Sequence, residues 1–444
     1  MSNVSATWTP SLATTGTDGS VEQIRQLVPC GGTMYAVGRF SEIKQGQATQ
    51  TRNNAFSFNA STGVLTNWNP NVNGQVNSVA LSTDCSVAYL GGTFTTIGST
   101  PAAVKNIAAV STGTGAVIPG FASSAGAKVN TLAMVKGGTH LLVGGNFTSI
   151  NGSTKKYLVS LNPTTGKDDG YVNLEHLREV CLHRRRGPAV KGNATQVFNT
   201  EVSPDGSKLL AMGVFTSVGG QARRQIFMLD LGAGSATVNA WYSGDFDFNC
   251  HIVEPFYLQA AAWAPDMSKV YVSTTGYKAA NGIGYQTFEP RGDLTATYTN
   301  ICDAAAAYPS TPATVRHDWI DYTGCDSLYS VAADSFAVYT GGHQRWADSP
   351  IQCDGNGNGT KVDSPGMSGL TLAGDSILDP GKVSPDGDLV NKYSKGRGLG
   401  ADDMVITSAG LWIASDNAQN VDACGKTSTG GVAHGHKGLC FLPY

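Results

Sequence analysis

The chain has 444 residues, of which 55 are glycine, and only 14% of its residues are charged. So much glycine and so little charge disfavour a helical protein, and a hydrophobic share of 41% excludes a disordered one. The net charge of −3 leaves no broad basic surface for nucleic acid, and no apolar run approaches the roughly 20 residues of a membrane-spanning helix.

The first residues are polar and contain no signal peptide, but the nine cysteines point to an oxidising compartment. None of them forms a CxxC pair or a Cys/His zinc pattern, and they are scattered through turn-rich sequence. We therefore predict a secreted protein whose signal peptide is absent from this sequence.

Along the chain, one segment recurs four times, as YAVGRFSEI from Tyr35, YLGGTFTTI from Tyr89, LLVGGNFTSI from Leu141 and LLAMGVFTSV from Leu209. A second set follows in step: AFSFNASTGVL, IAAVSTGTGAV, LVSLNPTTGKD and IFMLDLGAGSA. Alternating apolar residues between Gly-rich turns indicate strands, with four short strands in each unit.

A repeat of about 50 residues with four strands is typical of a β-propeller blade. We predict an all-β protein, a seven-bladed β-propeller forming a single domain over residues 1–444. Six or eight blades are the alternatives, because insertions lengthen the fifth and sixth units. The blades are expected at roughly residues 21–72, 73–125, 126–192, 193–250, 251–324, 325–395 and 396–444.

The two ends of the chain are expected to complete one blade. Trp8-Thr9-Pro10 repeats Trp68-Asn69-Pro70, which follows a third strand, whereas the sequence ends in a third strand, HKGLCFLPY. A strand at about residues 5–12 that pairs with residues 439–442 would close the ring and leave no exposed sheet edge.

The repeat GG-x-F-T-S, followed by LD-x-x-TG and W-N-P, resembles the secreted actinobacterial β-propeller proteins with delta-60 or kelch-like repeats. Further resemblance lies in HDWIDYTGCDSLYSV, VYTGGHQRW, GRGLGADDMV and GLWIASDN, so nearly the whole chain is covered. The resemblance implies a seven-bladed propeller and little about chemistry. One similar class of proteins interacts with secreted proteases and is a transglutaminase substrate, which suggests such partners here.

Two polar segments of the middle region are candidate sites. The run His183-Arg184-Arg185-Arg186 is expected to be an exposed loop, with a polyanion contact as the alternative. In WYSGDFDFNCHIVEPF, four side chains could form a metal or acid–base group: Asp245, Asp247, His251 and Glu254. No GxSxG or HExxH motif accompanies them, so we predict solvated carboxylates and no catalytic residue.

Two aromatic clusters are the candidate ligand-binding residues. RHDWIDYTG supplies His317, Asp318 and Trp319, and GGHQRWADS supplies His343, Arg345 and Trp346. Aromatic faces beside hydrogen-bond donors suit a sugar or peptide ligand. The alternative is that the aromatic rings pack between blades and the charged groups pair.

In the sixth unit, CDGNGNGTKVD has the oxygen-ligand spacing of the first half of a calcium loop. A possible calcium cofactor would be held by Asp354, Asn356, Asn358 and Asp363. Pro365 stands where an EF-hand has glutamate, so the alternative is a plain Asn-Gly turn.

Four disulfides are predicted: Cys30–Cys85, Cys250–Cys302, Cys325–Cys353 and Cys424–Cys440, which leaves Cys181 unpaired. Cys30 and Cys85 occupy equivalent turns of neighbouring blades, although sequence does not fix the connectivity.

These observations favour a monomeric secreted propeller that binds an extracellular glycan or protein through its loop face, without nucleic acid or a membrane span. Two alternatives stay open. The protein could be a partner or substrate of secreted proteases or transglutaminase, for which the Gln-containing loop 42–54 is suited. It could instead be a hydrolase or lyase with its site in the central channel, although we consider an enzyme the less supported reading.

Overall fold

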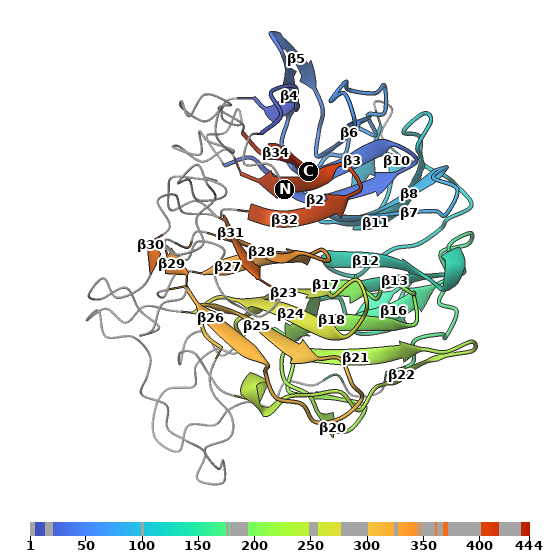
Figure 1. Ribbon diagram of the computed structural model, residues 1–444. Coiled ribbons are helices and arrows are strands. Elements are labelled where there is room, and N and C mark those ends of the chain that lie inside the picture. The colour runs from blue at the N-terminus through green and yellow to red at the C-terminus, as the bar shows by residue number, and fades with distance from the viewer. Residues whose placement is uncertain are drawn as a thin grey trace, which may run out of the picture.

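A computed structural model describes residues 5–13, 21–98, 102–174, 177, 194–247, 256–276, 301–323, 327–342, 344, 346–347, 360–361, 367–371, 401–416 and 437–444. Within this part of the chain the fold is all-β and propeller-like, built from small antiparallel sheets (Figure 1). Two short 3-10 helices are the only helices there, η1 (Lys136–Gly138) and η2 (Gly244–Asp247). No described helix is long and apolar enough to cross a membrane.

Among the described residues eight sheets contain three or four strands each, and seven of them follow one another along the chain as the main sheets. The first three are β2 (Gln23–Cys30), β3 (Thr33–Arg39) and β6 (Ala55–Asn59); β7 (Val76–Leu81), β8 (Val87–Gly92) and β11 (Ile107–Ser111); and β12 (Val129–Val135), β13 (His140–Gly145) and β16 (Leu158–Leu161). The four-stranded sheets are β17 (Gln196–Val202), β18 (Lys208–Val214), β21 (Ile226–Leu231) and β22 (Ala236–Val238); and β23 (Leu258–Trp263), β24 (Lys269–Thr274), β25 (Ala304–Pro309) and β26 (Trp319–Tyr322). The last two are β27 (Leu328–Ala333), β28 (Ala337–Gly342) and β31 (Met367–Thr371); and β32 (Ala401–Thr407), β33 (Gly410–Ser415) and β34 (Leu439–Pro443).

Small ribbons fill the connections between second and third strands. They are β1 (Ser11–Leu12) with β4 (Glu42–Gln45) and β5 (Ala48–Thr51); β9 (Thr96–Ile97) with β10 (Ala102–Ala103); β14 (Ser149–Ile150) with β15 (Ser153–Thr154); β19 (Ser217–Val218) with β20 (Gln221–Ala222); and β29 (Trp346–Ala347) with β30 (Thr360–Lys361).

The repeated G-x-F motif has a steric origin. A Cβ on its glycine would lie 2.0 to 2.3 Å from a carbonyl oxygen of the chain entering the first strand, at Gly38, Gly92, Gly145 and Gly213. The carbonyl of the motif phenylalanine accepts the N–H of the residue before the third strand, as from Asn54 to Phe40 at 3.0 Å. That residue has positive φ in five sheets: Asn54, Asn106, Tyr157, Gln225 and Asp303. The motif therefore closes the connection between the second and third strands.

Every first strand carries a β-bulge at the same place. The register shifts across Arg25, Asn77, Asn130, Phe198, Gln259, Tyr329 and Asp402. A bulge breaks the local ladder, which leaves backbone groups for other partners. The side chain that follows the bulge accepts a hydrogen bond from a backbone N–H of the next first strand. Gln26 Oε1 accepts from Val79 N–H at 2.7 Å, and Ser78 Oγ accepts from Leu132 N–H at 2.9 Å. Hydrogen bonds thus pass from one first strand to the following one.

The first strands succeed one another in contact, in the order β2, β7, β12, β17, β23, β27 and β32, and β32 also contacts β2. At this last contact, Asp403 Oδ2 accepts from Leu27 N–H at 2.8 Å. Gln23 also donates from its side-chain amide to Asp402. The interaction between the last and the first sheet is therefore of the same kind as that between sheets one and two.

The N-terminal segment lies beside the C-terminal strand, and Figure 1 shows both ends close to β2 and β32. Ala6 N–H donates to Phe441 O at 2.9 Å, and the Trp8 ring lies 5.6 Å from that of Phe441. Within residues 5–12 only Ser11–Leu12 forms a strand, and it pairs with β4, while Leu12 N–H also donates to Lys437 O at 2.8 Å. Pro10, which has no N–H to donate, precedes this short strand.

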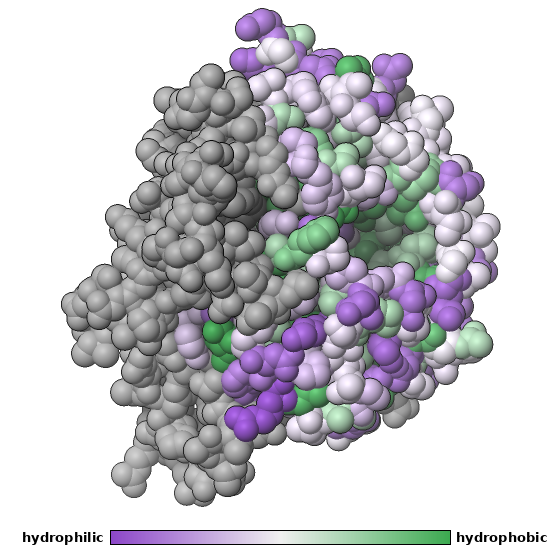
Figure 2. Space-filling view, in the orientation of Figure 1, coloured by the Kyte–Doolittle hydropathy of each residue, from purple (hydrophilic) through white to green (hydrophobic). Residues whose placement is uncertain are grey.

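A full fourth strand, expected in every unit, occurs only as β22 and β26 among the described residues. In the first three sheets it is reduced to single bridges, Phe58–Leu65, Val110–Val117 and Leu161–Asp168. In the first unit the chain turns away at Trp68, whose indole N–H donates to Ser111 O of the next sheet at 3.0 Å. The core consists of apolar clusters between successive sheets. Figure 2 shows that apolar residues also gather around a hollow on one side of the molecule.

Candidate functional site

The structure joins two side chains that the sequence placed in separate clusters. His317 Nδ1 lies 2.8 Å from Oδ2 of Asp245, whose side chain is fully buried in η2, while the His317 side chain is 22% exposed. Tyr308 Oη donates to the same oxygen at 3.1 Å, and Tyr257 Oη donates to the Asp245 carbonyl at 3.2 Å. Burial, and next the charge of Asp245, raise the pKa of Tyr308 well above its ordinary value, so this hydroxyl remains a donor.

A buried polar network supports this pair from the fourth sheet. Gln225 donates from Nε2 to Phe246 O at 2.9 Å and accepts the N–H of Tyr257 at 2.6 Å. Tyr242 Oη donates to Asp247 at 2.8 Å, and burial raises its pKa well above 10.0. Asp245 is therefore buried and hydrogen-bonded, so the prediction of a solvated carboxylate is wrong for this residue, whereas Asp247 is only partly buried. Chemically the dyad can hold the imidazole with Nδ1 protonated and accept a proton at Nε2.

The other two residues of the first aromatic cluster diverge from His317. Asp318 pairs with Lys269 Nζ at 2.7 Å, and the Trp319 ring stacks 6.0 Å from Tyr271 in the core between sheets. The three adjacent side chains therefore do not converge on one ligand in this structure, and their binding role stays a prediction.

The remaining predicted site residues lie outside the described part of the chain: His343, Arg345, His251, Glu254, the run 183–186 and the calcium-loop residues Asp354, Asn356, Asn358 and Asp363. Trp346 is described only through its backbone, in β29. Among the described residues, no group of three or more His, Cys, Asp or Glu side chains could hold a metal ion.

A cavity of about 390 Å³ lies where the first strands meet. Its polar lining includes Gln26, Asn199, Thr200, Glu201, Ser330, Asp402 and Asp403, and its apolar lining includes Val202, Trp263, Val331 and Ile406. These residues come from β2, β17, β23, β27 and β32, so the cavity lies on the line around which the first strands are arranged. The bulges bring successive polar side chains to this line.

The acidic residues of the cavity are held toward their neutral form. Burial raises the pKa of Glu201 to about 8, that of Asp402 to about 7 and that of Asp403 to about 6. Asp403 adds a smaller repulsive contribution at Glu201, whereas Arg25 opposes the shift at Asp402. Around neutral pH Glu201 thus keeps its carboxyl proton, so its side chain can both donate and accept hydrogen bonds.

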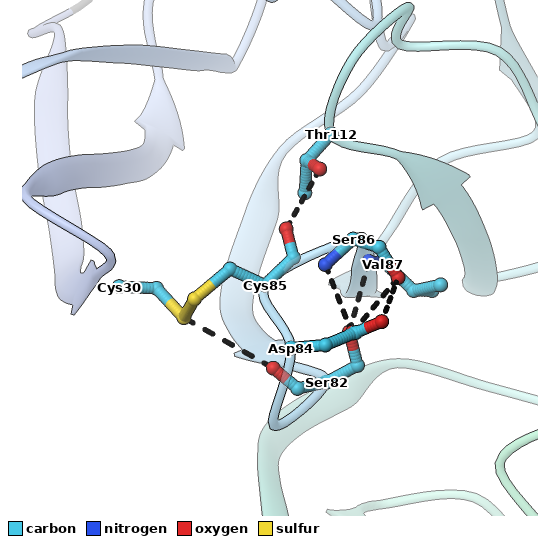
Figure 3. The surroundings of a disulfide bond; sticks show 7 residues. All are labelled: Cys30, Ser82, Asp84, Cys85, Ser86, Val87 and Thr112. Carbon is cyan, nitrogen blue, oxygen red and sulfur yellow. Dashed lines mark hydrogen bonds between the residues drawn. A yellow bond between two sulfur atoms is a disulfide. The ribbon is translucent and has the colours of Figure 1, made fainter.

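The predicted Cys30–Cys85 disulfide is confirmed, and it joins the hairpin turns of the first two sheets (Figure 3). Cys85 has φ of 60°, and Asp84 beside it accepts from Ser82 Oγ at 2.6 Å. These hydrogen bonds lower the pKa of Asp84 to about 2. Cys302 and Cys440 are also disulfide-bonded, while their predicted partners Cys250 and Cys424 lie outside the described residues, as do Cys181, Cys325 and Cys353.

Sequence reasoning missed the axial carboxylates. Glu201 stands in NTEVSPDG and Asp402-Asp403 in GLGADDMVI, within strands that are otherwise apolar or neutral. A charged residue on the first strand of a repeat was the available signal. The importance of these charges followed only from the arrangement of the first strands around one axis.

No family model matches the sequence, and no curated protein matches it either. Among solved structures, one described as the structure of U3-55K is similar at a TM-score of 0.50 and 10% identity, over 96% of this chain and 98% of that chain. A second, hydrazine synthase of Kuenenia stuttgartiensis, aligns at a TM-score of 0.44 and 13% identity, over 86% and 89% of the two chains. At such identity the first likeness supports the propeller-like fold alone.

Proposed function

We propose that the protein is a secreted, closed seven-bladed propeller that recognises an extracellular glycan in its axial cavity. Closure is supported by the contact of β32 with β2 and by the hydrogen bond from Leu27 N–H to Asp403. The contact of Trp8 supports closure too. The Trp8 carbonyl lies against the turn glycine Gly63 of the first sheet, in the same way as Asn69 lies against the turn glycine Gly115 of the second sheet. The N-terminal segment thereby takes the place of a last strand.

The observation that carries the proposed activity is the axial cavity of about 390 Å³ with its polar lining. Its volume is within the range of small-ligand sites. Neutral carboxyl and amide groups can each donate and accept hydrogen bonds, which matches the alternating hydroxyls of an uncharged sugar. Trp263 adds an apolar face for a sugar ring. The Cys30–Cys85 disulfide fits an extracellular location, because such bonds persist in oxidising surroundings.

A glycan array followed by calorimetric titration tests this proposal. Glu201→Met removes a cavity hydrogen-bonding group at similar length, and Glu42→Met makes the same change on the exposed surface of β4. We expect the first variant to weaken binding of the selected sugar at least tenfold and the second to leave it unchanged. Absence of glycan binding, or equal binding by all three proteins, would refute the axial site.

A second role, as a transglutaminase substrate, is favoured by the β4–β5 hairpin, which projects from the molecule in Figure 1. Gln45 is engaged, because its Nε2 donates to Gly63 O at 2.7 Å, and Gln50 accepts from Arg52 at 2.8 Å. Gln47 is exposed at the tip and makes no hydrogen bond within the described part of the chain. Acyl transfer would form an amide between this side chain and a primary amine and release ammonia.

Labelling with a bacterial transglutaminase and a fluorescent primary amine tests the second role. Peptide mapping should place the label on Gln47, and Gln47→Asn should abolish it, whereas Gln45→Asn and Gln50→Asn should retain it. Labelling that survives Gln47→Asn would show that this hairpin is not the acyl donor.

A further inference from the structure

The interface between the fifth sheet (β23–β26) and the sixth sheet (β27, β28 and β31) has an apolar and a polar part. Tyr271, Ala305, Leu328 and Val338 belong to one buried apolar cluster, with Trp319 packed against it. Side chains two residues further along a strand point to the same face. Ser273 follows Tyr271, Thr340 follows Val338 and Asp321 follows Trp319 in this way. These three polar side chains therefore face the same interface.

For two of these side chains the described residues provide no hydrogen-bond partner to the hydroxyl. Ser273 Oγ and Thr340 Oγ1 are buried and make no hydrogen bond within the part of the chain that the structure describes. Both residues are 0% exposed. An unsatisfied buried hydroxyl costs free energy, so a native structure that contains two in one interface indicates a missing partner.

The register of the fifth sheet places a carboxylate next to the first hydroxyl. Ser273 is opposite Ala305, and Ala305 is opposite Asp321, so only a methyl group separates the two polar side chains on this face. Asp321 is 2% exposed. The small side chain of Ala305 places no bulky group between the hydroxyl and the carboxylate in this row.

The facing sixth sheet contributes an amide group. Gln344 is 0% exposed, and its Nε2 donates to the backbone oxygen of Thr340 at 3.2 Å, which holds its amide beside the second unpartnered hydroxyl. At the same end of the interface, Asp303 Oδ1 accepts from Ser327 Oγ at 3.1 Å and is 2% exposed. The two sheets thus present buried hydroxyl, amide and carboxylate oxygens to the same interface.

We propose that a calcium ion binds between the fifth and sixth sheets, with Ser273, Asp321, Thr340 and Gln344 as its side-chain ligands. Calcium takes six to eight oxygen ligands and tolerates hydroxyl and amide oxygens beside carboxylates. The group contains no imidazole or thiolate, so zinc and copper are disfavoured. The site is distinct from the calcium loop predicted at residues 354–363, and it would lock two sheets together.

Thr340→Val is the most informative variant, because valine keeps the shape and removes only the hydroxyl. Protein stripped with EDTA should gain thermal stability on addition of calcium chloride. Thr340→Val should lose this calcium-dependent gain while melting at the same or a higher temperature in EDTA, since an unpartnered hydroxyl has been removed. Glu42→Gln, on the exposed surface of β4, should keep the gain in full, and Asp354→Asn separates the calcium loop predicted from the sequence from this site.

Terbium luminescence provides a second readout that does not depend on stability. Terbium bound here would be excited through Trp319, two residues from Asp321 on the same face, and calcium should displace it. Asp321→Asn should weaken terbium binding at least tenfold. The proposal is overturned if stripped protein binds neither ion, if Asp354→Asn alone abolishes binding, or if Thr340→Val retains the full calcium response.

Discussion

Replacing Glu201 with glutamine tests the electrostatics of the axial cavity. Burial raises the pKa of Glu201 from 4.5 to about 8. Because the folded-state pKa is above the unfolded value, the native state keeps a proton that the unfolded chain has released between these two pH values. The free energy of unfolding must therefore fall as pH rises through this window. At about 1.4 kcal/mol per pH unit the loss is at most about 5 kcal/mol, and water in the cavity reduces it.

Glu201→Gln has the same length and cannot ionise, so it should match the wild type at pH 5 and exceed its stability at pH 9. Asp402 and Asp403, whose pKa values are raised to about 7 and about 6, should still lower the stability of the variant up to neutral pH. Urea unfolding followed by tryptophan fluorescence at pH 5, 7 and 9 measures the difference. Glu42→Gln, on the exposed surface of β4, is the control.

The reasoning fails if Glu201→Gln and the wild type lose the same stability between pH 7 and 9. The same holds if the wild type becomes more stable as pH rises from 5 to 9. Either outcome would mean that Glu201 ionises with an ordinary pKa, as it would in a wide, well-hydrated channel.

Three further predictions concern the fold. Gly213→Ala should cost at least about 2 kcal/mol of stability, because its Cβ would lie 2.0 Å from Gln196 O. The control Gly220→Ala should cost about 1 kcal/mol, because only its positive φ is unfavourable. Equal losses of stability in thermal unfolding would contradict the steric origin of the motif. The double variant Cys30→Ser with Cys85→Ser removes the disulfide and should cost about 3–4 kcal/mol for a separation of 55 residues. The double variant Cys30→Ser with Cys85→Gly should recover about 1 kcal/mol, since Cys85 has φ of 60°. The denaturant midpoints of the two double variants measure this difference in stability. Asp403→Ala should cost about 1–3 kcal/mol of stability, because it leaves Leu27 N–H unpartnered. The loss should be comparable with that of Ser78→Ala at the interface between the second and third sheets, while Asp403→Asn keeps an acceptor and should lose less. If Asp403→Ala leaves the stability unchanged, that result would argue against a closed ring.

The candidate site was only partly predictable. His317 and Asp245 were both noted in the sequence, but as members of separate clusters 72 residues apart. Their pairing depends on residues 313–315, which precede β26, lying beside Tyr242, which precedes η2, and no local pattern encodes this. Conversely, Asp318 and Trp319 are adjacent to His317 in sequence yet contact Lys269 and Tyr271, because successive residues around a strand point to opposite faces.

The repeats could be predicted from the sequence because the interactions that produce them are local. Alternating apolar residues, the glycine of G-x-F and the turn residues before each hairpin act over a few positions, so the sequence alone determined the small antiparallel sheets and the equivalence of Cys30 and Cys85. The axial carboxylates, the His317–Asp245 pair and the buried hydroxyls of Ser273 and Thr340 were decided only by the tertiary structure. Their proximity arises from packing between sheets, where residues far apart in the chain share one desolvated space, and desolvation is a property of that space.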